Sequence, residues 1–240
     1  MEIREPEEMK LNTNMASLFH GYIMENINSS FAEDMHISEI RPFSQNLSRT
    51  RDRKWFWRVN TLTDRAEDEI IKMLIDKKSI YLSHKDVTLD ILSYELKRTD
   101  FDKLFEDNYI EGNKKRYIGV EFITPTAFKS GGKYINYPDL SLFFKSIINK
   151  YDKNSQSTKI FDDELIEQLS EGAEIIKYNL RSTYFSLEGT KIPSFAGKIT
   201  IKINGSPVTV NLVNMLVEFA EYSGVGIKNA LGMGGSIKTD

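Results

Sequence analysis

The 240-residue chain contains no cysteine, and this absence removes several kinds of chemistry. Without thiols there can be no disulfide framework, no thiolate nucleophile and no cysteine-based zinc or iron–sulfur site. Hydrophobic runs are short, and none approaches the ~20 residues that a transmembrane helix requires. The first eight residues, MEIREPEE, lack both the basic and the apolar region of a signal peptide. We therefore expect a soluble, cytoplasmic protein with no membrane partner.

Positive charge is not in excess either, because 32 Lys and Arg face 35 Asp and Glu, for a net charge of −3. Nucleic-acid-binding domains usually have a positive net charge, so the net charge of this chain argues against a nucleic-acid-binding domain. The charge is segregated, however: residues 2–8 carry −3 and residues 161–175 carry −6, which leaves +6 on the rest of the chain. The overall charge therefore does not exclude an RNA-binding surface.

The densest basic stretch lies between residues 49 and 58, where Trp55, Phe56 and Trp57 interleave with the cations. Cations beside aromatic rings suit a phosphate backbone and unstacked bases. An edge strand with exposed arginines would produce the same pattern, because charged edges are common in sheets. Both interpretations stay open, and the candidate contacts are Arg49, Arg51, Arg53 and Lys54.

Hydrophobic periodicity predicts an α+β first half in the order of a ferredoxin-like domain. A helix is expected from residue 15 to about residue 27, and Ser30 with Glu33 forms a capping box that would start a second helix ending near His36. The remaining predictions are strands at Met1–Arg4, Lys54–Leu62, Ser79–Leu82 and Val87–Leu96, and a helix at Asp64–Lys77.

The second half begins near Arg116 and has a similar order of elements. Strands are expected at Tyr117–Ile123, Ile175–Ser186, Lys198–Ile203 and Ser236–Thr239, and helices at Pro138–Lys150, at Asp162–Leu169 and from Ser206 to Gly224. Asn204 and Gly205 could instead form a hairpin turn. We predict two tandem ferredoxin-like domains, residues 1–114 and 115–240, from element order alone.

The most informative stretch is glycine-rich, with five of the 14 glycines between residues 224 and 235. Glycine tolerates positive φ and lets another backbone approach closely, as a loop over phosphates requires. The stretch matches neither the P-loop motif nor the Rossmann fingerprint, since Asn229 stands where the third glycine belongs and a helix precedes the loop. A helix C-cap would explain Gly224 but hardly the other four glycines.

The ending EYSGVGIKNALGMGG, residues 221–235, resembles the carboxy-terminal glycine-rich loop of the CRISPR-associated repeat-RNA endoribonucleases, the Cas-six family of the RAMP superfamily. Three weaker features agree in order: LFHG at 18–21 with a later Met-His at 35–36, RPFS at 41–44, and FITPTAFK at 122–129. The resemblance implies RNA contacts in the loop, and we expect these from Gly224, Gly226, Lys228, Asn229, Gly232, Gly234 and Gly235.

The resemblance also implies an activity: metal-independent cleavage of CRISPR repeat RNA in precursor transcripts to give guide RNAs. The 2′-hydroxyl would attack the adjacent phosphorus and leave a 2′,3′-cyclic phosphate and a 5′-hydroxyl, with no cofactor and no metal. The alternative is a non-catalytic RNA-binding subunit of a CRISPR ribonucleoprotein complex. The sequence leaves open whether other CRISPR effector subunits bind, and whether the protein is a monomer or a homodimer.

Such chemistry needs a proton acceptor, a proton donor and a cation for the phosphate, and the chain has only three histidines. The resemblance favours His20 and His36 as the proton-transfer pair, with either assignment of roles, and Arg41 as the cation. One continuous helix would hold the two histidines ~24 Å apart, so the chain must reverse near Ser29 and Ser30. His84 has no counterpart in the family and is expected in a turn.

Overall fold

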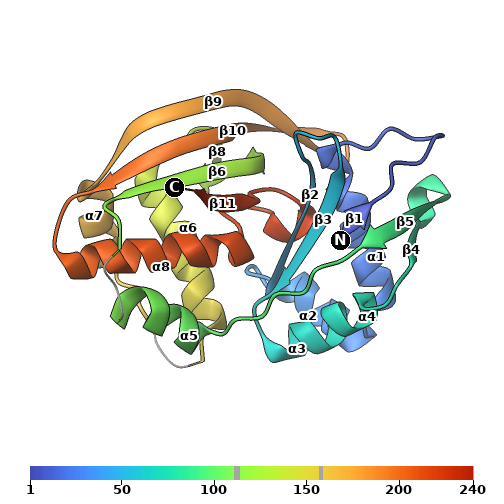
Figure 1. Cartoon of the computed structure of the whole chain (residues 1–240), viewed down its shortest axis with the longest axis horizontal. Coiled ribbons are helices and arrows are strands. Elements are labelled where there is room, and N and C mark those ends of the chain that lie inside the picture. Colours follow the sequence, from blue (N-terminus) through green and yellow to red (C-terminus); the bar gives the residue numbers. More distant parts are fainter. Residues whose placement is uncertain (111–113, 157–158, 240) are drawn as a thin grey trace.

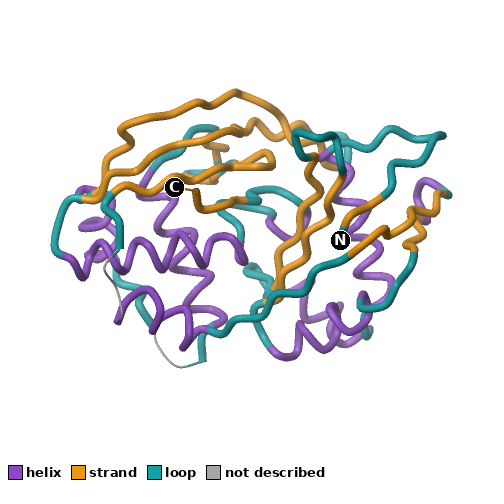
Figure 2. Tube along the Cα trace, in the orientation of Figure 1, coloured by secondary structure: helices purple, strands orange, loops and turns teal. Residues whose placement is uncertain are grey.

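The computed structural model describes residues 1–110, 114–156 and 159–239. Two antiparallel sheets lie side by side along the long axis of the molecule, each with helices packed on it (Figure 1). A stretch without helix or strand, residues 94–100, leads from the first sheet to the second half (Figure 2). In the described residues, no helix is long and apolar enough to cross a membrane.

The first half is a sheet of five strands in the order β2-β3-β1-β5-β4. Its strands are β1 (Glu2–Ile3), β2 (Phe43–Arg49), β3 (Trp55–Thr61), β4 (Ser79–Leu82) and β5 (Val87–Ser93). Its helices are α1 (Ala16–Asn26), α2 (Ser29–Ile37), α3 (Asp64–Ala66) and α4 (Lys72–Leu74), the last two joined by a π-helical turn at Glu67–Ile71. The inner order β2-β3-β1-β5 is that of a ferredoxin-like sheet, and β4 extends it at one edge.

The second half repeats this arrangement with the strand order β11-β6-β10-β9. Its strands are β6 (Tyr117–Thr126), β9 (Ala173–Leu187), β10 (Thr190–Ile203) and β11 (Ser236–Thr239), beside a small hairpin of β7 (Phe128–Ser130) and β8 (Lys133–Ile135). Its helices are α5 (Phe101–Phe105), α6 (Leu140–Asn154), α7 (Asp163–Glu171) and α8 (Pro207–Ser223). The predicted tandem ferredoxin-like fold is therefore confirmed.

Two hydrophobic cores accompany the two sheets, one under each. Leu104 of α5 is buried in the second core, so a helix that precedes the predicted domain boundary packs with the second half. The boundary between residues 114 and 115 stays a prediction, and residues 111–113 beside it lie outside the described ranges.

The predicted capping box is wrong, although the helix that it was to start is present. The Asn28 side chain caps α2 by accepting a hydrogen bond from the Ser30 backbone N–H at 2.9 Å, so Ser30 is the second residue of the helix and not its cap. The chain leaves α1 at Ile27, where φ is −92° and ψ is 167°. The reversal between the two histidines is therefore real, and it lies two residues earlier than predicted.

Two boundaries in the first half of the chain also differ from prediction. The helix expected to reach Lys77 ends at Leu74, because Ile75 is extended and Asp76 has a φ of 64°. The strand expected to reach Leu96 ends at Ser93. The helix predicted from Ser206 to Gly224 is confirmed, because α8 has Ser206 as its N-cap and Gly224 as its C-cap, and the alternative of a hairpin turn at Asn204 and Gly205 is wrong.

The β9–β10 hairpin is much longer than the sequence indicated. β10 begins at Thr190 instead of Lys198, and its pairing with β9 runs from Thr190 opposite Leu187 to Ile203 opposite Ala173. The turn consists of Glu188 and Gly189, both with positive φ, which matches the right-handed twist of the two strands. Cross-strand pairing thus extends β10 through residues whose local pattern does not predict a strand.

Candidate functional site

His20 lies on α1, where its ring stacks on that of Phe43 from β2 with centroids 5.9 Å apart and planes 12° apart. Burial, followed by the positive charges of Arg41 and His36, lowers the pKa of His20 from 6.5 to about 4, against a smaller opposing influence of the Ala230 backbone. His20 is therefore a neutral imidazole at physiological pH. Its four neighbours come from β2, from the end of α2, from the loop that follows α2 and from the glycine-rich segment.

His36 is exposed in the last turn of α2, and Arg41 follows five residues later. The Arg41 guanidinium is anchored by its Nε, which donates to the Met35 carbonyl at 3.1 Å. Burial lowers the pKa of Arg41. Met35, which Arg41 contacts, directly precedes His36, and Phe43, which stacks on His20, lies two residues after Arg41, so the three residues predicted to be catalytic lie in one region. His84 is exposed in the turn between β4 and β5, as predicted, and is not part of this group.

The glycine-rich segment, residues 224–235, closes over this group as a compact loop. Gly224, Gly226, Gly232 and Gly234 all have positive φ, between 69° and 111°. A Cβ on Gly226 would lie 2.2 Å from the Ala127 carbonyl oxygen, and one on Gly232 would lie 2.2 Å from the Ala16 Cβ of α1. Glycine is required at these positions because the loop packs tightly against both halves of the molecule.

Polar side chains fix the loop from inside. The Asn229 amide donates to the carbonyls of Val225 and Met233 at 3.0 and 3.1 Å, and Thr124 Oγ1 accepts from the Gly235 N–H at 2.8 Å. Asn229, Gly232, Gly234 and Gly235 are all buried. Their place as direct RNA contacts stays a prediction, and their burial gives them a packing role.

Lys228 is the exposed side chain of this loop, and it has a left-handed backbone with a φ of 57°. Among the described residues no carboxylate forms an ion pair with it. A positive charge at the tip of a rigid loop can bind an anion without first breaking an internal ion pair. Lys228 is thus suitably placed for a phosphate, and its contact with RNA stays a prediction.

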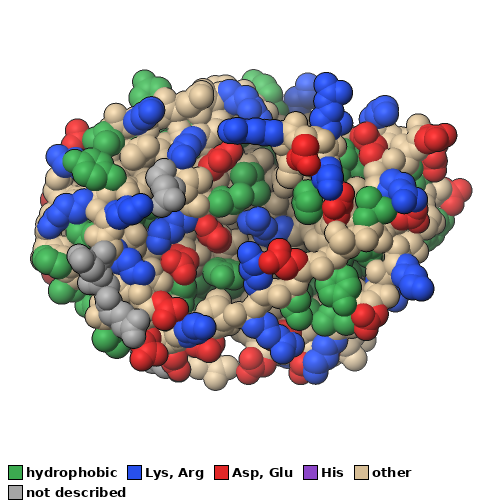
Figure 3. Space-filling model, in the orientation of Figure 1, with side chains coloured by type: hydrophobic (Ala, Val, Ile, Leu, Met, Phe, Trp, Pro, Cys, Tyr) green, Lys and Arg blue, Asp and Glu red, His purple; other side chains and the backbone are tan. Residues whose placement is uncertain are grey.

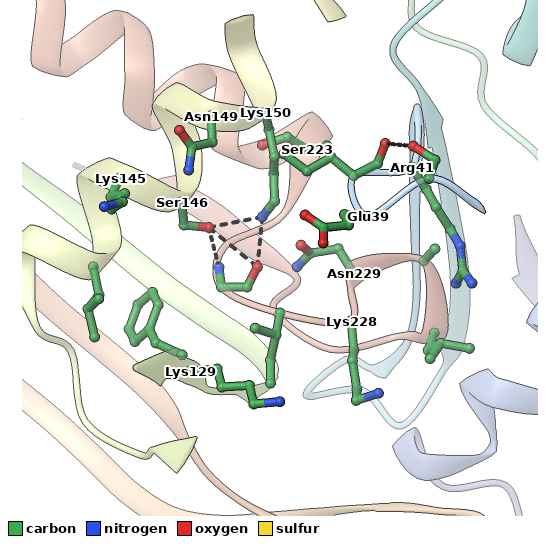
Figure 4. A pocket seen from close by; sticks show the side chains of 18 of the residues that line it. Glu39, Arg41, Lys129, Lys145, Ser146, Asn149, Lys150, Ser223, Lys228 and Asn229 are labelled. Carbon is green, nitrogen blue, oxygen red and sulfur yellow. Dashed lines mark hydrogen bonds between the residues drawn. The ribbon is translucent and has the colours of Figure 1, made fainter. Parts of the chain in front are cut away.

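A cavity of about 680 Å³ lies beside the loop, lined by residues 38–43, by α6 and the β7–β8 hairpin, and by residues 223–231 (Figure 4). Its cationic lining residues are Arg41, Lys129, Lys145, Lys150 and Lys228. Glu39 is the one acidic lining residue in the part of the chain that the structure describes. Phe43 and Ala230, the neighbours of His20, line the same cavity, so His20 lies directly behind one wall of a cationic pocket.

Three of these lysines, Lys129, Lys145 and Lys150, were not predicted from the sequence. A weak signal was available: Lys145, Ser146, Asn149 and Lys150 recur at helical spacing and form a polar stripe on α6. From the sequence alone, that stripe indicates an ordinary solvent-exposed helix face. In the structure, the glycine-rich loop packs on it.

The basic stretch at 49–54 forms the turn between β2 and β3, outside the cationic pocket. Arg51 and Arg53 are exposed there, Lys54 pairs with Glu2 at 3.1 Å, and Arg49 lies over the Trp55 ring at 5.7 Å. Trp55 and Trp57 are 5% and 0% exposed, so these two rings offer no face on which an RNA base could stack. RNA contacts by the four cations stay a prediction.

A second groove, of about 550 Å³, includes residues of β6, α8 and β11 among its lining. The face drawn in Figure 3 shows lysines, arginines and acidic residues intermixed around a hollow. The groove contains both Lys238 and Glu218, which pair at 3.2 Å. Its mixed charge distinguishes it from the cationic pocket.

No group of three or more His, Asp or Glu suited to a metal ion occurs in the described residues.

Comparisons with known proteins show the family to which the chain belongs. Residues 120–236 match the family model of the CRISPR-associated endoribonuclease Cas6. The chain is 33% identical to the Streptococcus thermophilus Cas6 endoribonuclease over 92% of its own length and 90% of that protein. It is 26% identical to a Mycobacterium tuberculosis Cas6 over 98% of its length and 74% of that protein.

Solved structures show the same fold. A Cas6 (TTHB231) product complex superposes with a TM-score of 0.80 at 21% identity, covering 99% of this chain and 97% of that one. A Cas6 (TTHA0078) substrate mimic complex gives 0.74 at 16% identity, covering 100% and 96%. Together with the relative at 33% identity over nearly the whole length, these matches show that the chain belongs to the Cas6 family of CRISPR-associated endoribonucleases.

Proposed function

We propose that this protein cleaves CRISPR repeat RNA within precursor transcripts, through attack of a 2′-hydroxyl on the adjacent phosphorus. The observation that carries the proposal is that Arg41 lines the cationic pocket and bonds to Met35 beside His36, while Phe43 of the same lining stacks on His20. Two imidazoles and a guanidinium suffice for the two proton transfers and the charge of this reaction. Neither a metal ion nor a cofactor takes part in the steps described below.

His20 is the proton acceptor in this proposal. Its lowered pKa, about 4, keeps the imidazole neutral at neutral pH, so that a ring nitrogen has a lone pair for the 2′-hydroxyl proton. As that proton leaves, the 2′-oxygen forms a bond to phosphorus. The positive charge that His20 gains is transient, and its unfavourable surroundings favour rapid loss of the proton after the reaction.

His36 is the complementary proton donor, and Arg41 stabilises the phosphate. The bond between phosphorus and the 5′-oxygen breaks, and the leaving oxygen takes a proton from His36, which gives a 5′-hydroxyl and a 2′,3′-cyclic phosphate. Arg41 cannot donate that proton because its guanidinium remains protonated, but it lines the pocket and can neutralise charge on the non-bridging oxygens. Each proton transfer typically contributes ~10²–10⁴-fold in rate.

RNA would reach this group through the cationic pocket, where Lys129, Lys145 and Lys228 are available for phosphates. The exposed Arg51 and Arg53 would extend the binding surface along the edge of the first sheet. Such local positive charge supports recognition of a particular RNA in a cleft better than general adhesion to nucleic acid, given the net charge of −3.

The test is cleavage of repeat RNA in the presence of EDTA, beside an analogue with deoxyribose before the scissile phosphate. We expect the wild-type protein to cut the RNA in EDTA, and to bind the analogue nearly as tightly without cutting it. Cleavage of the analogue would exclude 2′-hydroxyl attack, and complete inhibition by EDTA would exclude the metal-independent route. Unimpaired cleavage by a His20→Ala/His36→Ala variant would overturn the assignment of the site.

A further inference from the structure

Lys150 on α6 points into the glycine-rich loop (Figure 4). Its Nζ donates to the Gly224 carbonyl at 2.9 Å, to the Gly226 carbonyl at 3.0 Å and to Ser146 Oγ at 3.1 Å. All three partners are neutral. A lysine whose ammonium lies under a loop and meets only neutral oxygens requires an explanation, because transfer of a charge out of water is costly without an ionic partner.

The number of N–H donors on Lys150 excludes direct binding of an RNA phosphate as the explanation. An ammonium group has three N–H donors, and all three of Lys150 are used within the protein. The Ser146 hydroxyl is equally occupied: it accepts from the Gly226 N–H at 2.8 Å and from Lys150, and it donates to the Gly226 carbonyl at 3.3 Å. Lys150 therefore has no donor left for an RNA phosphate, although it lines the pocket.

The bonds that Lys150 makes hold the first part of the loop in one conformation. Gly224 and Gly226 both have positive φ, and their carbonyls point at the same ammonium. Two residues after Gly226, the backbone reaches Lys228, which is exposed and also has positive φ. Without Lys150, two half-buried carbonyls would lose their donor, and the segment leading to Lys228 would be free to rearrange.

We propose that Lys150, together with Ser146, is a positioning residue: it locks residues 224–226 and so holds the Lys228 side chain where an RNA phosphate binds. This inference rests on the proposed function, since it assumes that RNA occupies the pocket. Burial lowers the pKa of Lys150 to about 7, because the neutral oxygens around the amine do not compensate the charged form as a carboxylate would. Lys150 thus acts through Lys228 and not on the RNA itself.

Lys145 provides a matched control. It lies on the same helix, lines the same pocket and carries the same charge, but it is exposed, and no bond from it to the loop is found among the described residues. Loss of Lys145 should weaken RNA binding by removing charge alone. The two lysines of α6 should therefore affect RNA binding differently: Lys145 independently of Lys228, and Lys150 through Lys228.

The experiment is a double-mutant cycle on the affinity for the uncleavable deoxy analogue of the repeat RNA. The variants are Lys150→Met, Lys145→Met and Lys228→Ala, with the two double variants that contain Lys228→Ala. We expect Lys150→Met and Lys228→Ala each to weaken binding about 3- to 10-fold, and the Lys150/Lys228 double variant to be no weaker than the poorer single. The affinity losses caused by Lys145→Met and Lys228→Ala should multiply in their double variant.

The slope of log K against log salt is the second readout. Lys228→Ala should reduce the slope by about 0.7, Lys150→Met should reduce it equally, and the double variant should reduce it no further. The inference would be overturned if the affinity losses of Lys150→Met and Lys228→Ala multiplied in the double variant and their slope reductions added. That result would leave the proposed RNA binding intact. Failure of the wild-type protein to bind the analogue would instead overturn the proposed function. If Lys150→Met does not fold, Ser146→Ala replaces it in the cycle, with the same expected and contradicting results.

Discussion

The imidazole of His20 lies parallel to the ring of Phe43, with centroids 5.9 Å apart. This contact joins α1 to β2 and covers one face of the group that we assign as proton acceptor. Phe43 is 2% exposed, so it keeps water from that face of the imidazole. The protonation of His20 therefore depends on a residue that takes no part in the chemistry.

The first prediction concerns this contact. Phe43→Leu should admit water to His20 and raise its pKa from about 4 toward 6.5, because desolvation is the largest cause of the lowered value. An NMR titration of the imidazole resonances measures the change. Phe31→Leu, in the same core and also 2% exposed, is the control for general loosening. An equal pKa of His20 in the two variants would contradict the account.

The second prediction is a pH dependence of stability. The folded protein holds His20 at a lowered pKa, so between pH 4 and 6.5 the unfolded chain binds more protons. The free energy of unfolding should therefore rise with pH across this window, with a His20 contribution on the order of 2 kcal/mol that is complete above pH 6.5. Urea denaturation of wild type and His20→Gln at pH 4.5 and 7 measures it. The variant should show a flatter dependence, and an unchanged dependence would refute the burial argument.

Much of this site could be predicted from the sequence, and the failures have physical causes. The family resemblance grouped His20, His36 and Arg41, and a visible break between two short helices allowed that grouping, even though Asn28 and not Ser30 caps the second helix. The sequence left open whether Trp57 faces solvent, because an aromatic residue beside arginines looks the same on either face of a strand. In the structure it packs edge-on against Phe19, with centroids 5.0 Å apart.

Lys150 could not have been found in this way. Its function depends on α6 packing against residues nearly 80 positions later, and local periodicity carries no information about such a contact. The length of β10 has the same kind of cause, because its first residues are strand only through pairing with β9. The glycines were correctly singled out for positive φ and close approach, but the atoms that approach Gly226 and Gly232 belong to the protein itself.

The third prediction separates those two roles for glycine. Gly226→Ala should destabilise the protein by about 1–3 kcal/mol, because it forces a Cβ onto a residue with φ of 75° and against the Ala127 carbonyl. Gly21→Ala is the control, since it lies within α1 with nothing within 4 Å of the new methyl group. Alanine there should be neutral or stabilising by up to ~1 kcal/mol. Equal melting temperatures for the two variants would show that the loop is not packed as described.

The fourth prediction concerns the turn between β2 and β3. If Arg51 and Arg53 contact RNA phosphates, replacing either by Ala should lower the salt slope of RNA binding by about 0.7. Arg98→Ala is the control, because Arg98 is exposed and paired with Glu67, outside the cationic pocket. A slope unchanged in both turn variants would mean that the turn is simply a charged sheet edge.

The division of labour between the two histidines is the central claim, and a modified leaving group tests it most directly. When the 5′-bridging oxygen at the scissile phosphate is replaced by sulfur, the leaving thiolate needs no proton donor. The account predicts that this substrate restores cleavage to His36→Ala but not to His20→Ala. Restoration of His20→Ala alone, or of neither variant, would contradict it.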